Sequence, residues 1–135
     1  MNHGNIFGKI VNKKMTLNEY GEISQKCRHD LPIHINYCYL REYVIMPDHI
    51  HGIIEIKHSK DVLDSKMLNF KKIPRHQGLP NIIRSFKSAS SRLIHQAGFE
   101  NFQWQKSYYD IIIKSHHELI QYVKYINNNP INWKK

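Results

Sequence analysis

The sequence predicts an α+β fold with one mainly antiparallel sheet and helices packed on it. Runs of β-branched and aromatic residues alternate with segments in which apolar residues recur every three or four positions. Turn residues separate neighbouring strand runs, which favours antiparallel hairpins. At 135 residues, with 41% hydrophobic residues, the chain is long enough for one domain with a substantial core, and we assign residues 1–135 to it.

The first predicted elements are a hairpin and a helix. Residues 6–11 and 15–17 are apolar-rich runs on either side of an Asn-Lys-Lys turn. Asn18 is a suitable N-cap for a helix over residues 18–29. We expect Pro32 to end this helix, because a proline cannot continue the helical hydrogen bonding.

A central hairpin follows. Residues 34–44 form its first strand run, and the second strand run ends near Lys57. Pro47 and Asp48 between them are turn residues. Residues 58–78 lack a regular apolar period, which predicts an exposed loop.

Two more helices and a strand complete the predicted fold. Residues 80–96 have helical apolar spacing and a proline in the first turn. The aromatic and β-branched run at 108–113 predicts a strand. A capping box at residues 115–118 opens a helix over 116–128, which Pro130 should stop.

The helix over 80–96 has two distinct faces. Its predicted buried stripe consists of Ile82, Phe86, Ala89 and Leu93. The basic side chains off that stripe, with serines between them, are Arg84, Lys87 and Arg92. Small polar and basic residues suit contacts to phosphate groups, although a simply solvated face is the alternative.

His49 and His51 follow the central turn and flank Ile50. Side chains alternate along a strand, so both imidazoles should project from one face while Ile50 points into the core. Two parallel imidazoles can share one divalent metal. Ten histidines in 135 residues produce such a pair by chance nearly once, so two solvated histidines remain an alternative.

Composition indicates a polyanionic partner. The chain has 20 lysines and arginines against 11 acidic residues, a net charge of +9, and nucleic acid is the commonest partner of such a domain. The alternative is a basic protein that binds nothing specific. No apolar run is long enough to span a membrane and no signal-peptide pattern is present, so we expect a cytoplasmic protein without a membrane partner. Cys27 and Cys38 should then be reduced, buried thiols.

On the last predicted helix, Tyr125 lies off the apolar stripe of Leu119, Val123 and Ile126. Asn129 lies one turn later on the same side as Tyr125. This spacing could place a phenol beside an amide ligand of a metal. Alternatively, the tyrosine covers the flank of the helix and the asparagine caps its end.

Four stretches together resemble a known family. They are Asp48-His49-Ile50-His51, Ile82-Ile83-Arg84-Ser85-Phe86-Lys87-Ser88, Trp104-Gln105-Lys106-Ser107-Tyr108-Tyr109-Asp110 and Tyr125-Ile126-Asn127-Asn128-Asn129-Pro130. In this order, over nearly the whole chain, they are similar to the single-tyrosine HUH transposases, most closely the REP-associated tyrosine transposases. The resemblance implies a ferredoxin-like HUH nuclease fold.

The resemblance also implies the site and the reaction. His49, His51 and Asn129 would bind Mg²⁺ or Mn²⁺, and Tyr125 would be the nucleophile. The implied activity is cleavage and strand transfer of single-stranded or hairpin DNA through a 5′-phosphotyrosine intermediate, as in DNA transposition. Two imidazoles and one amide carry no net charge, which keeps a bound metal electrophilic, and the imidazoles favour Mn²⁺ somewhat.

The implied DNA contacts combine charge and stacking. The basic residues expected to bind DNA are Arg84, Lys87, Arg92 and Lys106. Trp104, Tyr108 and Tyr109 could stack on bases of a single strand, although a core position is an equally good interpretation of each ring.

The chain departs from the family pattern in two places. Asp48 stands where the family usually has asparagine, a change that we expect to be benign. We expect the family's first strand to be absent before residue 6, so the sequence predicts an N-terminally truncated fold that is marginal alone or forms a homodimer through strand edges. Two other functions stay open for these reasons: a catalytically impaired DNA-binding remnant, and an unrelated metal-dependent phosphodiester hydrolase that uses water as its nucleophile.

Overall fold

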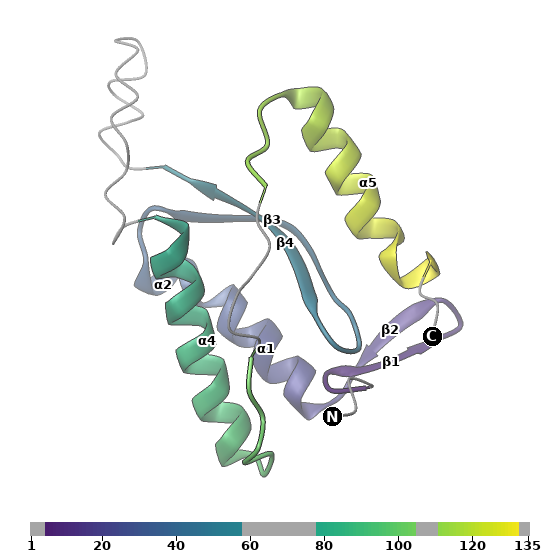
Figure 1. The fold of residues 1–135 in the computed structure, drawn as a ribbon, viewed down its shortest axis with the longest axis vertical. Coiled ribbons are helices and arrows are strands. Elements are labelled where there is room, and N and C mark those ends of the chain that lie inside the picture. The colour runs from purple at the N-terminus through teal and green to yellow at the C-terminus, as the bar shows by residue number, and fades with distance from the viewer. Residues whose placement is uncertain (1–4, 58–77, 105–110, 133–135) are drawn as a thin grey trace.

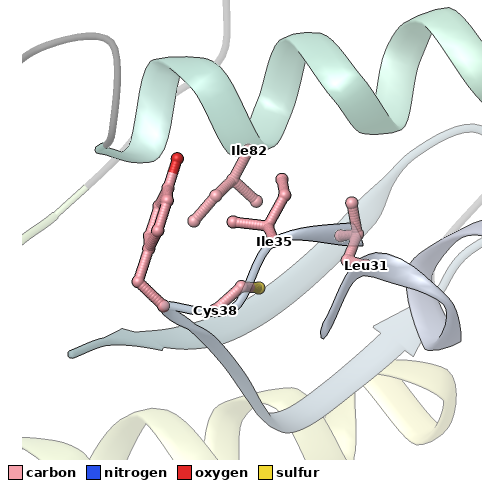
Figure 2. Close-up of a cluster of buried hydrophobic side chains, with 5 residues drawn as sticks. Leu31, Ile35, Cys38 and Ile82 are labelled. Carbon is pink, nitrogen blue, oxygen red and sulfur yellow. The ribbon is translucent and has the colours of Figure 1, made fainter. Parts of the chain in front are cut away.

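The computed structural model describes residues 5–57, 78–104 and 111–132, and these form the predicted α+β fold (Figure 1). In chain order the elements are β1 (Gly8–Val11), β2 (Lys14–Leu17), α1 (Glu19–His29), α2 (Leu31–His34), β3 (Cys38–Ile45), β4 (Ile50–Ile56), α4 (Leu79–Gln96) and α5 (His116–Asn132). The β3–β4 hairpin lies in the middle, with α1 and α4 on one side and α5 on the other (Figures 1 and 2). No helix within these ranges is long and apolar enough to cross a membrane.

The described strands form two separate antiparallel hairpins, so the prediction of a single sheet is wrong for this part of the chain. β1 and β2 are joined by Asn12 and Lys13, whose φ angles of 53° and 63° fit a tight hairpin turn. The β1–β2 pair, which we call the small sheet, is joined to the central hairpin just before β1. There the Phe7 N–H donates to the Pro47 carbonyl at 2.9 Å. This bond reaches the turn of the β3–β4 hairpin and not a strand edge, so the two sheets do not merge.

A bulge in β3 changes which residues face the helices. One extra residue lies between Leu40 and Tyr43, so the side-chain alternation reverses there and both residues face α1 and α4. The Arg28 guanidinium of α1 lies 3.7 Å from the centre of the Tyr43 ring and donates to the Arg41 carbonyl at 2.6 Å. Arg28 therefore binds the backbone of β3 at the bulge and packs on the Tyr43 ring beside it.

The hydrophobic core consists of two clusters between the central hairpin and α4. The first contains Leu31, Ile35, Tyr37, Cys38 and Ile82 (Figure 2). The second contains Phe7, Ile45, Ile94 and Phe102. Ile50 packs against the second cluster, as predicted from the alternation of its strand. Cys27 and Cys38 are buried free thiols, also as predicted.

The first predicted helix is confirmed, but the role of Pro32 is not. The Asn18 side chain accepts from the Gly21 N–H at 2.9 Å and caps α1. The helix ends at His29, and Pro32 lies in the first turn of α2, a position in which its missing N–H costs nothing. Because α2 occupies Leu31–His34, β3 begins at Cys38 and not at residue 34.

α4 matches the predicted helix, with a different buried stripe. The most buried positions are Ile82, Ser90 and Ile94, with Phe86 partly buried between them, and not Ala89 and Leu93. Ser90 is buried because it is hydrogen-bonded: its hydroxyl accepts from Trp104 Nε1 at 2.9 Å and donates to the Phe86 carbonyl at 2.6 Å. Apolar spacing alone does not predict a buried serine.

The last helix begins as predicted and runs further. Ser115 Oγ accepts from the Glu118 N–H at 3.1 Å, as in a capping box. α5 continues past Pro130 to Asn132, which means that one hydrogen bond to the preceding turn is missing there. The predicted strand at 108–113 lies partly outside the described residues, and residues 111–113 are not in a strand. The predicted loop at 58–78 lies almost entirely outside them.

Candidate functional site

The turn that carries the histidines is held by the core beneath it. Met46 is 1% exposed, and Pro47 is fully buried beside it. The Met46 N–H donates to the His49 carbonyl at 2.8 Å. The Phe7 N–H, just before β1, donates to the Pro47 carbonyl. Asp48 and His49 therefore start from an anchored backbone, which reduces the number of positions that their side chains can adopt.

His49 and His51 point to one place on the α5 side of the hairpin. Their Nε2 atoms lie 3.0 Å apart, and their rings meet edge to face with centroids 4.6 Å apart. Two nitrogens on adjacent corners of an octahedron with bonds of about 2.1 Å lie about 3.0 Å apart, so the observed spacing suits a shared divalent metal. The prediction that both imidazoles share a strand face is confirmed, although His49 precedes the first residue of β4.

The two imidazoles have different surroundings. Desolvation by burial, and next the neighbouring His49, lower the pKa of His51 below its ordinary value. His49 Nδ1 lies 2.6 Å from Asp48 Oδ1. A metal ligand must be the neutral imidazole, and the lowered pKa of His51 favours that form.

α5 brings Tyr125 to the histidines. The Tyr125 ring lies edge to face with His51, with centroids 5.6 Å apart, and 56% of the residue is exposed. The next residue, Ile126, is only 4% exposed and anchors the helix. Because Tyr125 is exposed while its neighbour Ile126 is buried, Tyr125 can contact a macromolecule without rearrangement of the core.

Asn129 lies one turn beyond Tyr125 on the same side of α5, and its Nδ2 atom is buried without a hydrogen-bond partner. A buried amide group without a partner is costly, so its surroundings call for an explanation. A 180° rotation of the amide exchanges nitrogen for oxygen and would present a metal ligand at this position. The orphaned atom therefore fits the predicted role of Asn129.

Two of the three predicted metal ligands, His49 and His51, converge at a spacing that suits a divalent metal. Within the described ranges there is no group of three or more His, Cys, Asp or Glu side chains that could hold a metal ion. The predicted ligands are two imidazoles and one amide, which is a different kind of group. In such a site His49 and His51 would supply the converging nitrogens, and Asn129 would supply its amide oxygen.

Of the predicted DNA-binding residues that the structure describes, two line one groove and the third lies outside it. Arg84 and Lys87 line a groove of about 590 Å³ along α4, together with Ser88, Ser91 and His95. Arg92 does not line this groove, and its charge lowers the pKa of Cys27 on α1, although burial raises that pKa more strongly. Lys106 lies outside the described residues.

Trp104 is mainly a core side chain. It stacks on Phe7, with ring centroids 5.2 Å apart, and also packs against Phe86 and Phe102. Part of it nevertheless lines the α4 groove. Tyr108 and Tyr109, the other rings expected to stack on bases, lie outside the described residues.

The chain is similar in sequence to a protein of Haemophilus influenzae. The chain is 33% identical over 135 residues to an uncharacterized protein of Haemophilus influenzae, an alignment that covers 96% of this chain and 75% of that protein. A search against family models found no match. No solved structure matches the chain.

Proposed function

The chain belongs to the same family as this Haemophilus influenzae protein, and we propose that it cleaves and rejoins single-stranded DNA with Tyr125 as the nucleophile. The carrying observation is that two histidines converge at 3.0 Å while an exposed tyrosine from another element contacts one of them. We further propose that the described elements are part of a ferredoxin-like HUH nuclease fold.

Tyr125 would attack a backbone phosphorus through its phenolic oxygen. A Tyr–O–P bond forms, the P–O3′ bond breaks, and the products are a 5′-phosphotyrosine and a free 3′-hydroxyl that has taken up the phenolic proton. The new phosphodiester bond conserves the energy of the old one, so a second 3′-hydroxyl can reverse the step without ATP. This property is what joining of DNA strands requires.

A free phenol, with an ordinary pKa near 10, is a weak nucleophile at neutral pH. His49, His51 and Asn129 would hold Mg²⁺ or Mn²⁺, which when bound polarises the phosphate and neutralises developing charge. The protein's own contribution is orientation. The anchored turn fixes the imidazoles, and Ile126 in the core fixes the helix that presents Tyr125.

The experiment uses single-stranded hairpin oligonucleotides with Mn²⁺, read for a covalent protein–DNA adduct on a denaturing gel. We expect an adduct with the unaltered protein and none with Tyr125→Phe, which removes one oxygen and keeps the ring. Tyr122→Phe, one turn away on the same helix, is the matched control and should form the adduct normally.

Other outcomes distinguish the alternatives. Metal-dependent cleavage without an adduct would indicate a hydrolase with water as its nucleophile. DNA binding without cleavage would indicate a non-catalytic remnant. An adduct that persists in Tyr125→Phe and disappears in Tyr122→Phe would move the nucleophile to the other tyrosine. Homodimer formation and a cytoplasmic location remain predictions from the sequence.

A further inference from the structure

We propose that Asp48 is a positioning residue, which holds His49 in the tautomer and orientation needed to bind the metal. This inference deepens the proposed function and rests on its metal site. From the sequence we expect the aspartate at this position to be benign, whereas in the structure its carboxylate lies directly against the first histidine of the pair.

The contact is short and comes from a constrained backbone. Asp48 Oδ1 lies 2.6 Å from His49 Nδ1, which is short for a hydrogen bond between a ring N–H and a carboxylate. The Asp48 side chain is 27% exposed and the His49 side chain is 40% exposed, so both are partly shielded from solvent. The bonds at Met46 and Pro47 keep the two residues in this arrangement.

The chemistry of the two groups decides the tautomer. An ionised carboxylate can only accept hydrogen bonds, so His49 Nδ1 must carry the proton. In the neutral ring the proton is then absent from Nε2, the atom that lies 3.0 Å from His51 Nε2. A carboxylate that accepts from the far nitrogen of a metal-binding histidine fixes the tautomer and the orientation of the ring.

No comparable carboxylate contact is seen for His51 in the described part of the chain. The ring of His51 contacts those of His49 and Tyr125. The two ligands would therefore be unequal: His49 is oriented by a charged neighbour, and His51 is oriented by packing. Asp48 would also place a negative charge beside a set of neutral ligands, and this charge would favour the binding of a divalent cation at the site.

The test measures Mn²⁺ binding by titration calorimetry, without DNA, for the unaltered protein, Asp48→Asn and Asp48→Ala. Loss of an outer carboxylate typically weakens metal affinity 10- to 100-fold, and we expect that range for Asp48→Ala. Asp48→Asn keeps an acceptor without the charge and should fall between the two. Asp30→Asn, which removes a carboxylate at the end of α1, is the control and should bind normally.

A second readout reports the tautomer directly. Nitrogen-15 NMR of the metal-free protein should show His49 protonated on Nδ1, and Asp48→Ala should lose that preference. The proposal is overturned if Asp48→Ala binds Mn²⁺ within twofold of the unaltered protein, or if the His49 tautomer is unchanged. If the unaltered protein binds no Mn²⁺, the metal itself is excluded and the proposed function fails with it. If Mn²⁺ binds as expected but no DNA adduct forms, only the proposed strand transfer fails.

Discussion

At the scale of single residues, the site consists of exposed side chains whose neighbours in the chain are buried in the core. Tyr125 is more than half exposed, but its neighbour Ile126 is in the core. His49 and His51 follow a turn whose Met46 and Pro47 are buried. Reactive groups on an anchored backbone keep their geometry when a substrate approaches, which is the usual requirement for positioned catalysis.

Metal binding and nucleophilic attack should be separable by substitution. His49→Ala removes a converging nitrogen and should weaken Mn²⁺ binding by more than about 100-fold, because it deletes a ligand and not only a neighbour of one. Adduct formation should be lost together with the metal. Tyr125→Phe should lose the adduct and bind Mn²⁺ normally, as measured by titration calorimetry.

A chelator tests whether adduct formation requires the metal, without any substitution. EDTA should abolish adduct formation by the unaltered protein, and excess Mn²⁺ should restore it. His34→Ala, which alters an exposed histidine at the end of α2, should change neither binding nor activity. Equal loss in both histidine variants would show that the effect is not specific to the pair.

The shared face of the histidine pair was predictable because strand alternation acts within three residues. The contact between Asp48 and His49 was not predicted, since a turn aspartate has several local hydrogen-bonding choices and only the fold selects one. The half-buried setting of Asn129 depends on how α5 packs against β3, which lies more than 80 residues away in the chain.

At the scale of elements, α4 is tied to the segment that follows it by a polar contact in the core. Ser90 is fully buried and receives the Trp104 indole N–H. Around it, Trp104 packs on Phe7, which lies just before β1, and on Phe86 of α4. The Ser90 hydroxyl therefore connects α4 to the segment that follows it.

Ser90→Ala should destabilise the protein by about 1–3 kcal/mol, because it leaves a buried indole N–H without a partner. The free energy of unfolding can be measured by urea denaturation followed by circular dichroism. Ser88→Ala, at an exposed position of the same helix, should change stability by no more than about 0.5 kcal/mol. If Ser90→Ala is as stable as Ser88→Ala, water or another group satisfies Trp104.

Element positions were largely predictable where capping and periodicity agree. Asn18 and Ser115 cap α1 and α5 where the sequence indicates. Two of the misassigned helix boundaries lie at prolines, because Pro32 begins a short helix and Pro130 lies inside one. The bulge in β3 also escaped prediction, since it is stabilised by Arg28 from another element.

At the scale of the whole molecule, the basic groove and the candidate site lie on different sides of the central hairpin. α4, which carries the groove, packs on one face of β3–β4, and α5, which carries Tyr125, packs on the other (Figure 1). The overall α+β class followed from local patterns, whereas this separation depends on long-range packing. A DNA strand that occupies both sites would have to pass around an edge of the hairpin.

This arrangement predicts that affinity and chemistry respond to different substitutions. Arg84→Glu and Lys87→Glu should each weaken DNA binding, because these side chains line the groove. Each should also reduce the slope of log affinity against log salt concentration by about 0.7, the value for one phosphate contact to a single strand. At saturating DNA, the rate of adduct formation should be unchanged, since α4 and α5 lie on different sides of the central hairpin.

Arg92→Glu is the charge-matched control on the same helix, because Arg92 lies outside the groove and acts on Cys27 of α1. Its salt slope should equal that of the unaltered protein, provided that circular dichroism shows a normal fold. The measurement is a fluorescence-anisotropy titration of a labelled hairpin oligonucleotide at several salt concentrations, followed by single-turnover adduct assays. If all three variants keep the salt slope of the unaltered protein, the groove does not bind phosphate. A slower adduct rate at saturating DNA in Arg84→Glu would instead mean that the groove and the tyrosine site act on the same phosphates, which the separation of α4 from α5 argues against.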